Sequence, residues 1–279
     1  MKKTARSIGV FDSGVGGLTV LRALRALLPA EDLIYLGDTA RLPYGTKSRE
    51  SVVRYSLQAA EVLAQRDLKY LVVACNTASA AALHALRDRF APLPVIGVLE
   101  PGARAAVAAS RSNRIAVIAT EGTVQAGAYQ EAIQLLRPGV AVDARACPLF
   151  VALAEEGWTD GAIVEAIARR YLEPMFAPRA GERAGAAAAD VLVLGCTHFP
   201  VLAGCMQRVV GPLVTLVDSA GTTARAGADQ LAALALLRSD SGPGRTSLLA
   251  TDGAARFARI GSQFLGERIA PEGVEIVDL

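Results

Sequence analysis

Short apolar runs that alternate with longer amphipathic stretches constrain the fold of this 279-residue chain most strongly. The run at residues 7–11 (SIGVF) precedes residues 18–28, where leucines recur at helical spacing until Pro29. The same order of strand and helix continues to about residue 98 and starts again near residue 114. Strands without a polar face, each followed by a helix, indicate parallel sheets covered by helices on both sides. We therefore predict an α/β fold, and the length allows one large domain or two medium ones.

Two of the predicted strands end in a cysteine followed by small polar residues. Cys75 stands in VVACNTAS and Cys196 in LVLGCTHFP, 121 positions later (196 − 75). Parallel sheets bind ligands at the carboxyl ends of their strands, where a loop leads into a helix. The N-terminus of that helix can lower the pKa of a thiol and make it a base. Taken alone, each cysteine is also compatible with a buried, inert packing residue.

A glycine-rich turn follows the first strand. Asp12 ends this strand, and Gly14, Gly16 and Gly17 lead into the next helix. Glycines let backbone amides approach an anion, which the helix N-terminus favours. The turn lacks the Gly-Lys-Ser/Thr of a Walker loop and fails the G-x-G-x-x-G pattern at Thr19. A tight turn capped by Asp12 explains it equally well.

The repetition of the cysteine motif favours one kind of chemistry. Two equivalent thiols suit a reaction in which one removes a proton from a carbon and the other returns a proton to the opposite face. A Cys–His hydrolase needs one nucleophile, and neither cysteine begins a C-x5-R phosphate loop. His198, two residues after Cys196, is placed to assist that thiol, whereas His84 lies within a predicted helix and is interpreted as structural. The pattern predicts a racemase.

We expect this proton transfer to need no cofactor. The four cysteines form no C-x-x-C pair and only two histidines exist, so no zinc site is predicted. Lys47 is the one plausible lysine for a Schiff base with pyridoxal phosphate. The carbanion formed by proton removal then needs hydrogen-bond donors on the α-carboxylate, and Asn76, Thr77 and Thr197 are suitable.

Charge and hydropathy exclude several other classes of protein. The 29 basic and 27 acidic residues are spread along the chain, for a net charge of +2, so no nucleic-acid partner is indicated. The sequence has neither a signal peptide at its start nor an apolar run of about 18 residues that could cross a membrane. We predict a cytoplasmic protein. The alanine-rich stretch at residues 177–189 is expected to form an exposed loop or a frayed helix.

Several motifs, which follow one another in order over roughly residues 8–220, resemble glutamate racemase. This cofactor-independent family makes D-glutamate for peptidoglycan. The stretches that carry the resemblance are GVFDSGVGGLTVLRAL, YLGDTARLPYGTKS, VVACNTASA, VIGVLEPG, CPLFVALAEEG and LGCTHFPVL.

The resemblance implies two pseudo-symmetric three-layer α/β/α domains with mostly parallel sheets and the active site in the cleft between them. The first domain would be discontinuous, with residues 1–98 and 211–279, and the second would span residues 99–210. Family members commonly form homodimers. Members that a peptidoglycan precursor activates have a longer segment before the first strand than Met1 to Arg6, so we do not expect such activation here.

The resemblance also assigns roles to individual residues. Cys75 would take the proton from D-glutamate and Cys196 from L-glutamate, with Asp12 beside the first thiol and His198 beside the second. Glu155 matches an acidic position near the site. Together with Asp12 and His198, the substrate-contacting positions are Ser13, Tyr44, Gly45, Asn76, Thr77 and Thr197.

Two alternatives stay open at this point. An aspartate racemase or a related isomerase of the same superfamily shares the layout of two sites, and the length of the substrate pocket is not readable from the sequence. A non-catalytic amino-acid-binding protein is the second alternative, although a binder has no use for two thiol bases.

Overall fold

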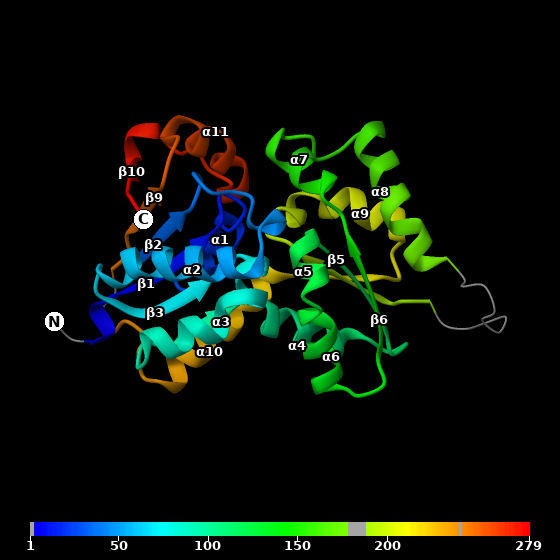
Figure 1. Cartoon of the computed structure of the whole chain (residues 1–279), viewed down its shortest axis with the longest axis horizontal. Coiled ribbons are helices and arrows are strands. Elements are labelled where there is room, and N and C mark those ends of the chain that lie inside the picture. The colour runs from blue at the N-terminus through cyan, green and yellow to red at the C-terminus, as the bar shows by residue number, and fades with distance from the viewer. Residues whose placement is uncertain (1–2, 178–187, 240–241) are drawn as a thin grey trace.

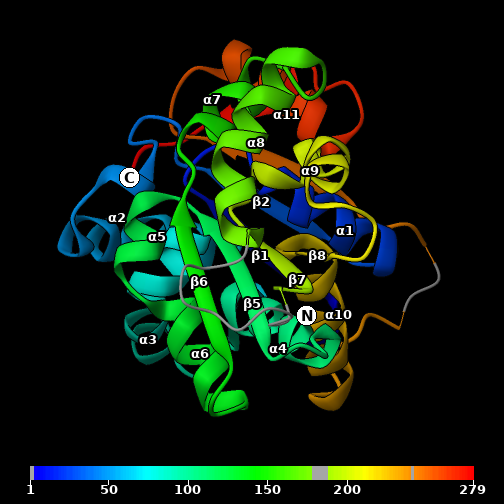
Figure 2. The same ribbon diagram turned by 90° about the vertical axis from the view of Figure 1, so that its right-hand side faces the viewer.

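The computed structural model describes residues 3–177, 188–239 and 242–279, and the statements below concern these residues. The loop expected at residues 177–189 lies almost entirely outside them. Two separate sheets form, and helices cover both faces of each (Figures 1 and 2). This arrangement confirms the predicted α/β fold.

The first sheet has six parallel strands in the order β10-β9-β2-β1-β3-β4. Chain order reverses at β1, which lies between β2 and β3. Its strands are β1 (Ser7–Asp12), β2 (Leu33–Gly37), β3 (Leu68–Val73), β4 (Val95–Gly97), β9 (Thr246–Ala250) and β10 (Val274–Ile276).

The second sheet has four parallel strands in the order β6-β5-β7-β8. Its order reverses between β5 and β7. Its strands are β5 (Arg114–Ala119), β6 (Ala141–Ala146), β7 (Val191–Gly195) and β8 (Thr215–Asp218).

Helices pack on both faces of the first sheet. One face is covered by α2 (Arg49–Ala64) and α3 (Asn76–Phe90), which also pack on each other. The opposite face is covered by α1 (Leu18–Leu27), α10 (Ser219–Ala233) and α11 (Ala254–Leu265).

The second sheet is also covered twice. On one face lie α4 (Leu99–Ala109) and α6 (Ala128–Leu136), with α5 (Glu121–Gln125) at the end of β5. On the other lie α7 (Leu149–Glu155), α8 (Ala162–Phe176) and α9 (Ala203–Val210). Short 3₁₀ turns are η1 (Lys3–Ala5), η2 (Tyr44–Thr46), η3 (Phe199–Leu202) and η4 (Pro271–Gly273).

Burial on both faces explains why the strands are continuously apolar. In β1, Val10 packs with α1 and α10 on one face, whereas its neighbour Phe11 packs with α2 and α3 on the other. In β5, Ile118 and Val117 divide in the same way between the two faces of the second sheet. Successive side chains of a strand point to opposite faces, so both must be apolar when helices cover both.

Two features of the chain path differ from the simple pattern of the sequence. The stretch at residues 122–136 forms two helices, α5 and α6, because Gly127 adopts a left-handed conformation (φ 65°) that ends the first helix. The second domain was expected to end at residue 210, but β8 pairs with β7, so the second sheet extends past that boundary. The chain returns to the first sheet in α10, which packs on α1. The division into two domains itself stays a prediction.

The parallel topology determines where a ligand can bind. The carboxyl ends of parallel strands meet at one edge, and ligands bind where the strand order reverses. Those points lie after β1 and β3 in the first sheet and after β5 and β7 in the second. No helix in the described part of the chain is long and apolar enough to cross a membrane.

Candidate active site

Cys75 stands at the N-terminus of α3, immediately past β3. Its side chain is 5% exposed, and its sulfur accepts a hydrogen bond from the backbone amide of Ala78 at 3.4 Å. The thiol donates to the hydroxyl of Ser13 at 3.6 Å, which ties it to the turn after β1. Cys75 and Ser13, both expected in the site, therefore lie together.

Cys196 stands at the corresponding position after β7 and is also 5% exposed. Nδ1 of His198 lies 3.8 Å from its sulfur. Nε2 of the same ring lies 3.3 Å from Oε1 of Glu155, within ion-pair distance but not aligned as a hydrogen bond. The thiol of Cys196, the imidazole of His198 and the carboxylate of Glu155 thus form one row, as expected.

Asp12 lies between the two cysteine sites. Its Oδ2 accepts from the amide of Gly14 at 3.0 Å, and its Oδ1 accepts from the hydroxyl of Thr197 at 3.5 Å. The contact with Thr197 crosses from the first sheet to the second. A methyl group on Gly16 would lie 2.5 Å from Nδ1 of His198, so the turn after β1 packs directly on the loop after β7.

The charges of these groups are coupled. Burial raises the pKa of the Cys75 thiol to about 12, and the Asp12 and Cys196 charges add to the increase. Burial likewise raises the pKa of Asp12, although the positive charge of His198 opposes it. A charge on Cys196 is therefore close enough to act on the Cys75 thiol. The N-terminus of α3 was expected to lower the pKa of Cys75, but desolvation is the larger effect.

His198 is the group whose protonation the site favours most. Burial by itself lowers the pKa of an imidazole, but the contacts with Cys196 and Glu155 and the charge of Asp12 raise that of His198 to about 10. Contact with His198, and then with Arg256, holds the pKa of Glu155 below its ordinary value. Near neutral pH His198 is thus an imidazolium beside the ionised carboxylate of Glu155.

Three threonine hydroxyls form a triangle across the two sheets. Oγ1 of Thr77 lies 3.0 Å from that of Thr120 and 3.1 Å from that of Thr123, and the last two are 3.0 Å apart. Thr77 follows β3, whereas the others follow β5. A methyl group on Gly45 would lie 2.6 Å from the Thr120 side chain, so the expected residue Gly45 reaches the same place.

The side chains of two expected residues are engaged elsewhere. The hydroxyl of Tyr44 donates to the buried carboxylate of Asp38 at 2.5 Å, so only the backbone of Tyr44 is left for a substrate. Oδ1 of Asn76 accepts from the hydroxyl of Tyr129 at 2.7 Å, and its Nδ2 donates to Ser219 at 3.5 Å.

Sequence reasoning missed Thr120 and Thr123. The only signal was their position at the end of a predicted strand. This signal is weak, because threonine is also common there as a helix cap. Arg256 was also missed. Its guanidinium donates to Oε2 of Glu155 at 2.8 Å from α11, a helix that carries no recognised motif.

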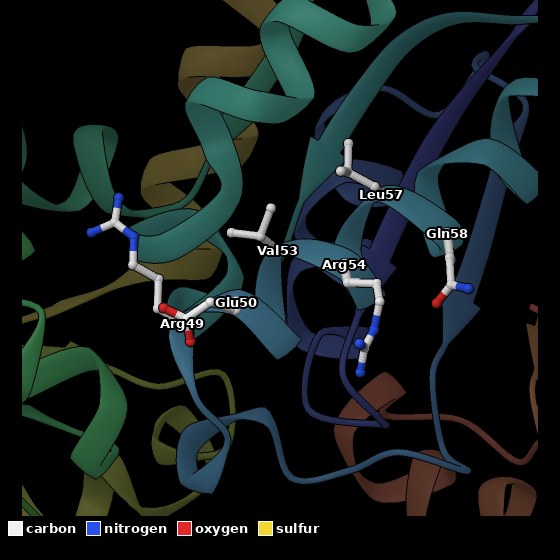
Figure 3. A pocket seen from close by; sticks show the side chains of 6 residues that line it. All are labelled: Arg49, Glu50, Val53, Arg54, Leu57 and Gln58. Carbon is white, nitrogen blue, oxygen red and sulfur yellow. The ribbon is translucent and has the colours of Figure 1, made fainter.

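The structure contains one pocket beside the expected site residues and another pocket away from them. One of about 280 Å³ lies where η2, α5 and α7 meet, and it contains site residues from both sheets. It is lined by Leu42, Pro43, Gly45, Thr46, Thr120, Glu121, Pro148, Val151, Ala152 and Glu155. Another of about 530 Å³ lies over the outer face of α2 and contains no expected site residue (Figure 3). Its lining residues are Arg49, Glu50, Val53, Arg54, Leu57 and Gln58.

No suitable cluster for a metal ion occurs in the described ranges: nowhere do three or more His, Cys, Asp or Glu side chains converge in a ligating arrangement. Lys47, the one lysine considered for a Schiff base, is exposed just after η2. Cys147 and Cys205 are buried as free thiols, and no expected site residue bonds to either.

Comparison with known proteins shows the family of this chain. The sequence profile of the Asp/Glu/Hydantoin racemase family matches residues 8–227. The chain is 53% identical over 264 residues to glutamate racemase of Geobacter metallireducens, covering 95% of this chain and 94% of that one.

Solved structures agree with the fold over nearly the whole length. Glutamate racemase RacE1 of Bacillus anthracis has a TM-score of 0.90 at 37% identity, covering 99% of this chain and 98% of that one. Glutamate racemase of Francisella tularensis, solved in complex with D-glutamate, has a TM-score of 0.88 at 34% identity with the same coverage. This chain therefore belongs to the glutamate racemases within the Asp/Glu/hydantoin racemase family and is an amino-acid racemase.

Proposed function

We propose that this chain interconverts L-glutamate and D-glutamate by proton transfer between Cys75 and Cys196. The observation that carries the proposal is the placement of both thiols at carboxyl ends of strands, each of them buried, with a charge on Cys196 close enough to act on Cys75. Glutamate is the bound ligand of the Francisella relative, which supports the choice of substrate.

The contacts of the two thiols support a choice of base before substrate binds. We propose that the protonated His198, with its Nδ1 3.8 Å from the Cys196 sulfur, assists Cys196 as that base, whereas the raised pKa keeps Cys75 as a thiol. Cys196 would then remove the α-proton of L-glutamate, and Cys75 would donate a proton to the opposite face of the same carbon. The reverse reaction begins with the opposite protonation states, because an acid in one direction is the base in the other.

The carbanion that forms at the α-carbon must be stabilised by donors aimed at the substrate carboxylate. We propose that the hydroxyls of Ser13, Thr77 and Thr197 and the backbone amides near Gly45 supply them. The threonine triangle would open towards a carboxylate in place of its mutual hydrogen bonds, which adds Thr120 as a further donor. Asp12 accepts a hydrogen bond from Thr197, and its charge acts on the Cys75 thiol, so it would assist proton transfer at Cys75.

Incubation with L-glutamate in heavy water tests substrate and chemistry together. Deuterium should appear at the α-carbon while the circular dichroism signal decays towards zero. Cys75→Ala and Cys196→Ala should each lower the rate at least about 1,000-fold, whereas Cys205→Ala, a buried cysteine in α9, should leave it unchanged. Near-normal rates in either of the first two variants would disprove the pairing.

The same assay separates the alternatives. Faster exchange with L-aspartate than with L-glutamate would identify an aspartate racemase. Binding of glutamate without exchange would identify a non-catalytic binding protein. Inhibition by chelators or carbonyl reagents would point to a metal or pyridoxal cofactor, whereas the proposed chemistry is insensitive to both.

We further propose that the D-glutamate supplies cytoplasmic peptidoglycan synthesis and that the chain acts as a homodimer. Growth of a D-glutamate-requiring bacterium carrying this gene tests the first point, and the Cys75→Ala variant is its control. Sedimentation equilibrium tests the second, because a mass near 29 kDa would indicate a monomer.

A further inference from the structure

Glu155 is held from two sides by residues of different sheets. It ends α7 beside the second sheet, and its Oε1 faces His198 at 3.3 Å. Its Oε2 accepts a hydrogen bond at 2.8 Å from Arg256, which lies on α11 over the first sheet. Figure 1 shows α7 and α11 facing each other, and Figure 2 shows them side by side at the same end of the molecule. The ion pair therefore joins the two halves directly behind the row of His198 and Cys196.

The position of Arg256 is unfavourable for its own helix. It is the third residue of α11, and the first turn contains no acidic residue. The helix dipole favours negative charge at this end and opposes a cation. The Arg256 side chain is also 52% exposed, so it adds little to the core. Helix stability does not account for this arginine, whereas the carboxylate of Glu155 does.

A second contact from the same helix fixes the imidazole. The rings of Phe264 and His198 meet edge to face, with centroids 5.1 Å apart and planes at 75°. At the end of α7, a methyl group on Gly157 would lie 3.3 Å from Oε1 of Gln263, so α11 also closes against the residues that follow Glu155. One helix thus holds both His198 and its carboxylate partner.

We propose that Arg256 is a positioning residue that acts through Glu155 to hold His198 against Cys196. The inference rests on the proposed racemase function, in which His198 assists that thiol. Arg256 touches no reacting atom. It restricts the Glu155 carboxylate to one orientation, and this orientation keeps Nδ1 of His198 directed at the sulfur. Loss of this restraint should slow proton transfer rather than weaken substrate binding, because geometry at the reacting atoms controls the rate.

The test compares Arg256→Gln with Arg259→Gln, which removes an exposed arginine of the same helix one turn later. Arg256→Gln should lower kcat about fivefold with KM within about twofold of wild type. Arg259→Gln should change neither. Arg256→Lys should recover part of the loss, because it restores a cation that can reach Glu155.

A double-mutant cycle then asks whether the effect passes through Glu155. In a Glu155→Gln background, Arg256→Gln should cause no further loss of kcat. The proposal would be overturned if Arg256→Gln lowered kcat equally in the wild-type and Glu155→Gln backgrounds, or if the Arg256→Gln single variant kept wild-type kcat.

If the Glu155→Gln enzyme is too slow to assay, the NMR ring signal of His198 replaces kcat as the readout. The chain has only two histidines, and Arg256→Gln should shift that signal whereas Arg259→Gln should not. A wild-type protein that fails to racemise glutamate would instead refute the proposed function.

Discussion

Replacing Gly16 by alanine should separate the two loops that form the site. A methyl group at Gly16 would lie 2.4 Å from Oγ1 of Thr197 and 2.5 Å from Nδ1 of His198. Ordinary contacts begin near 3.4 Å, so the side chains of Thr197 and His198, or the loop after β7 that carries them, must move by about 1 Å (3.4 − 2.4). The backbone at Gly16 is not in the left-handed region, so strain of its own conformation does not add to this effect.

A displacement of about 1 Å at reacting groups costs about 100-fold in rate. We therefore expect Gly16→Ala to lower kcat for L-glutamate about 100-fold and to destabilise the fold by about 1–3 kcal/mol. Circular dichroism measures both quantities, through the loss of the substrate signal and through thermal unfolding. Gly14→Ala is the matched control in the same turn, because a methyl group there meets Leu42 at an ordinary 3.4 Å. If Gly16→Ala keeps a rate within threefold of wild type, the loops are not in the contact described above.

Three further predictions concern buried charged groups. Because the pKa of His198 is raised to about 10 from 6.5, the stability it contributes is complete below pH 6.5 and is lost as the pH rises through about 10. Its NMR ring signal should titrate near pH 10, with His84→Gln used for assignment, and titration near 6.5 would contradict the charge network. Because burial raises the pKa of Cys75 to about 12, iodoacetamide at pH 8 should label it about 1,000-fold more slowly than a free cysteine, as mass spectrometry would measure. Lys69 and Glu31 form an ion pair whose side chains are only 1% and 2% exposed. Lys69→Met leaves that buried carboxylate without its cation, with a hydrogen bond from the amide of Arg238 retained, and should lower the urea unfolding free energy by about 3–5 kcal/mol without changing kcat; a loss under about 1 kcal/mol would refute this.

The positions of the catalytic candidates were predictable because strand direction determines them. A cysteine that directly follows an apolar strand in a parallel sheet must lie at the edge where the other strands also end. Asp12, Cys75 and Cys196 all satisfy this condition, and the structure brings their loops into contact. Strand periodicity and chain order are local properties, so the sequence alone contains them.

Properties that depend on distant neighbours were not predictable. Arg256 stands 101 residues after Glu155, and no motif connects the two. The helix terminus at Cys75 suggested a lowered pKa, but the burial that raises it comes from the packing of several elements. Tyr44 was recognised by its motif, yet the engagement of its hydroxyl by Asp38 required the folded loop.

The chain path shows the same limit. Gly127 lies in a stretch with helical composition, and only its left-handed backbone shows that the helix is divided there. The strand at Thr215–Asp218 has partners in the second sheet that lie 24 residues before it, from Val191 to Leu194, so its membership could not be assigned from local pattern.

One apolar cluster contains residues of both sheets, from Ile8 and Val10 in β1 to Leu192 and Leu194 in β7. The hydrophobic core of each half is therefore completed by residues of the other half. A fragment limited to residues 99–218 would expose to water the side chains of α4 and β8 that α10 now covers, and it should aggregate rather than fold alone. The two halves are expected to unfold in a single thermal transition. A core substitution near Cys75 should therefore also reduce the stability of the half that contains Cys196.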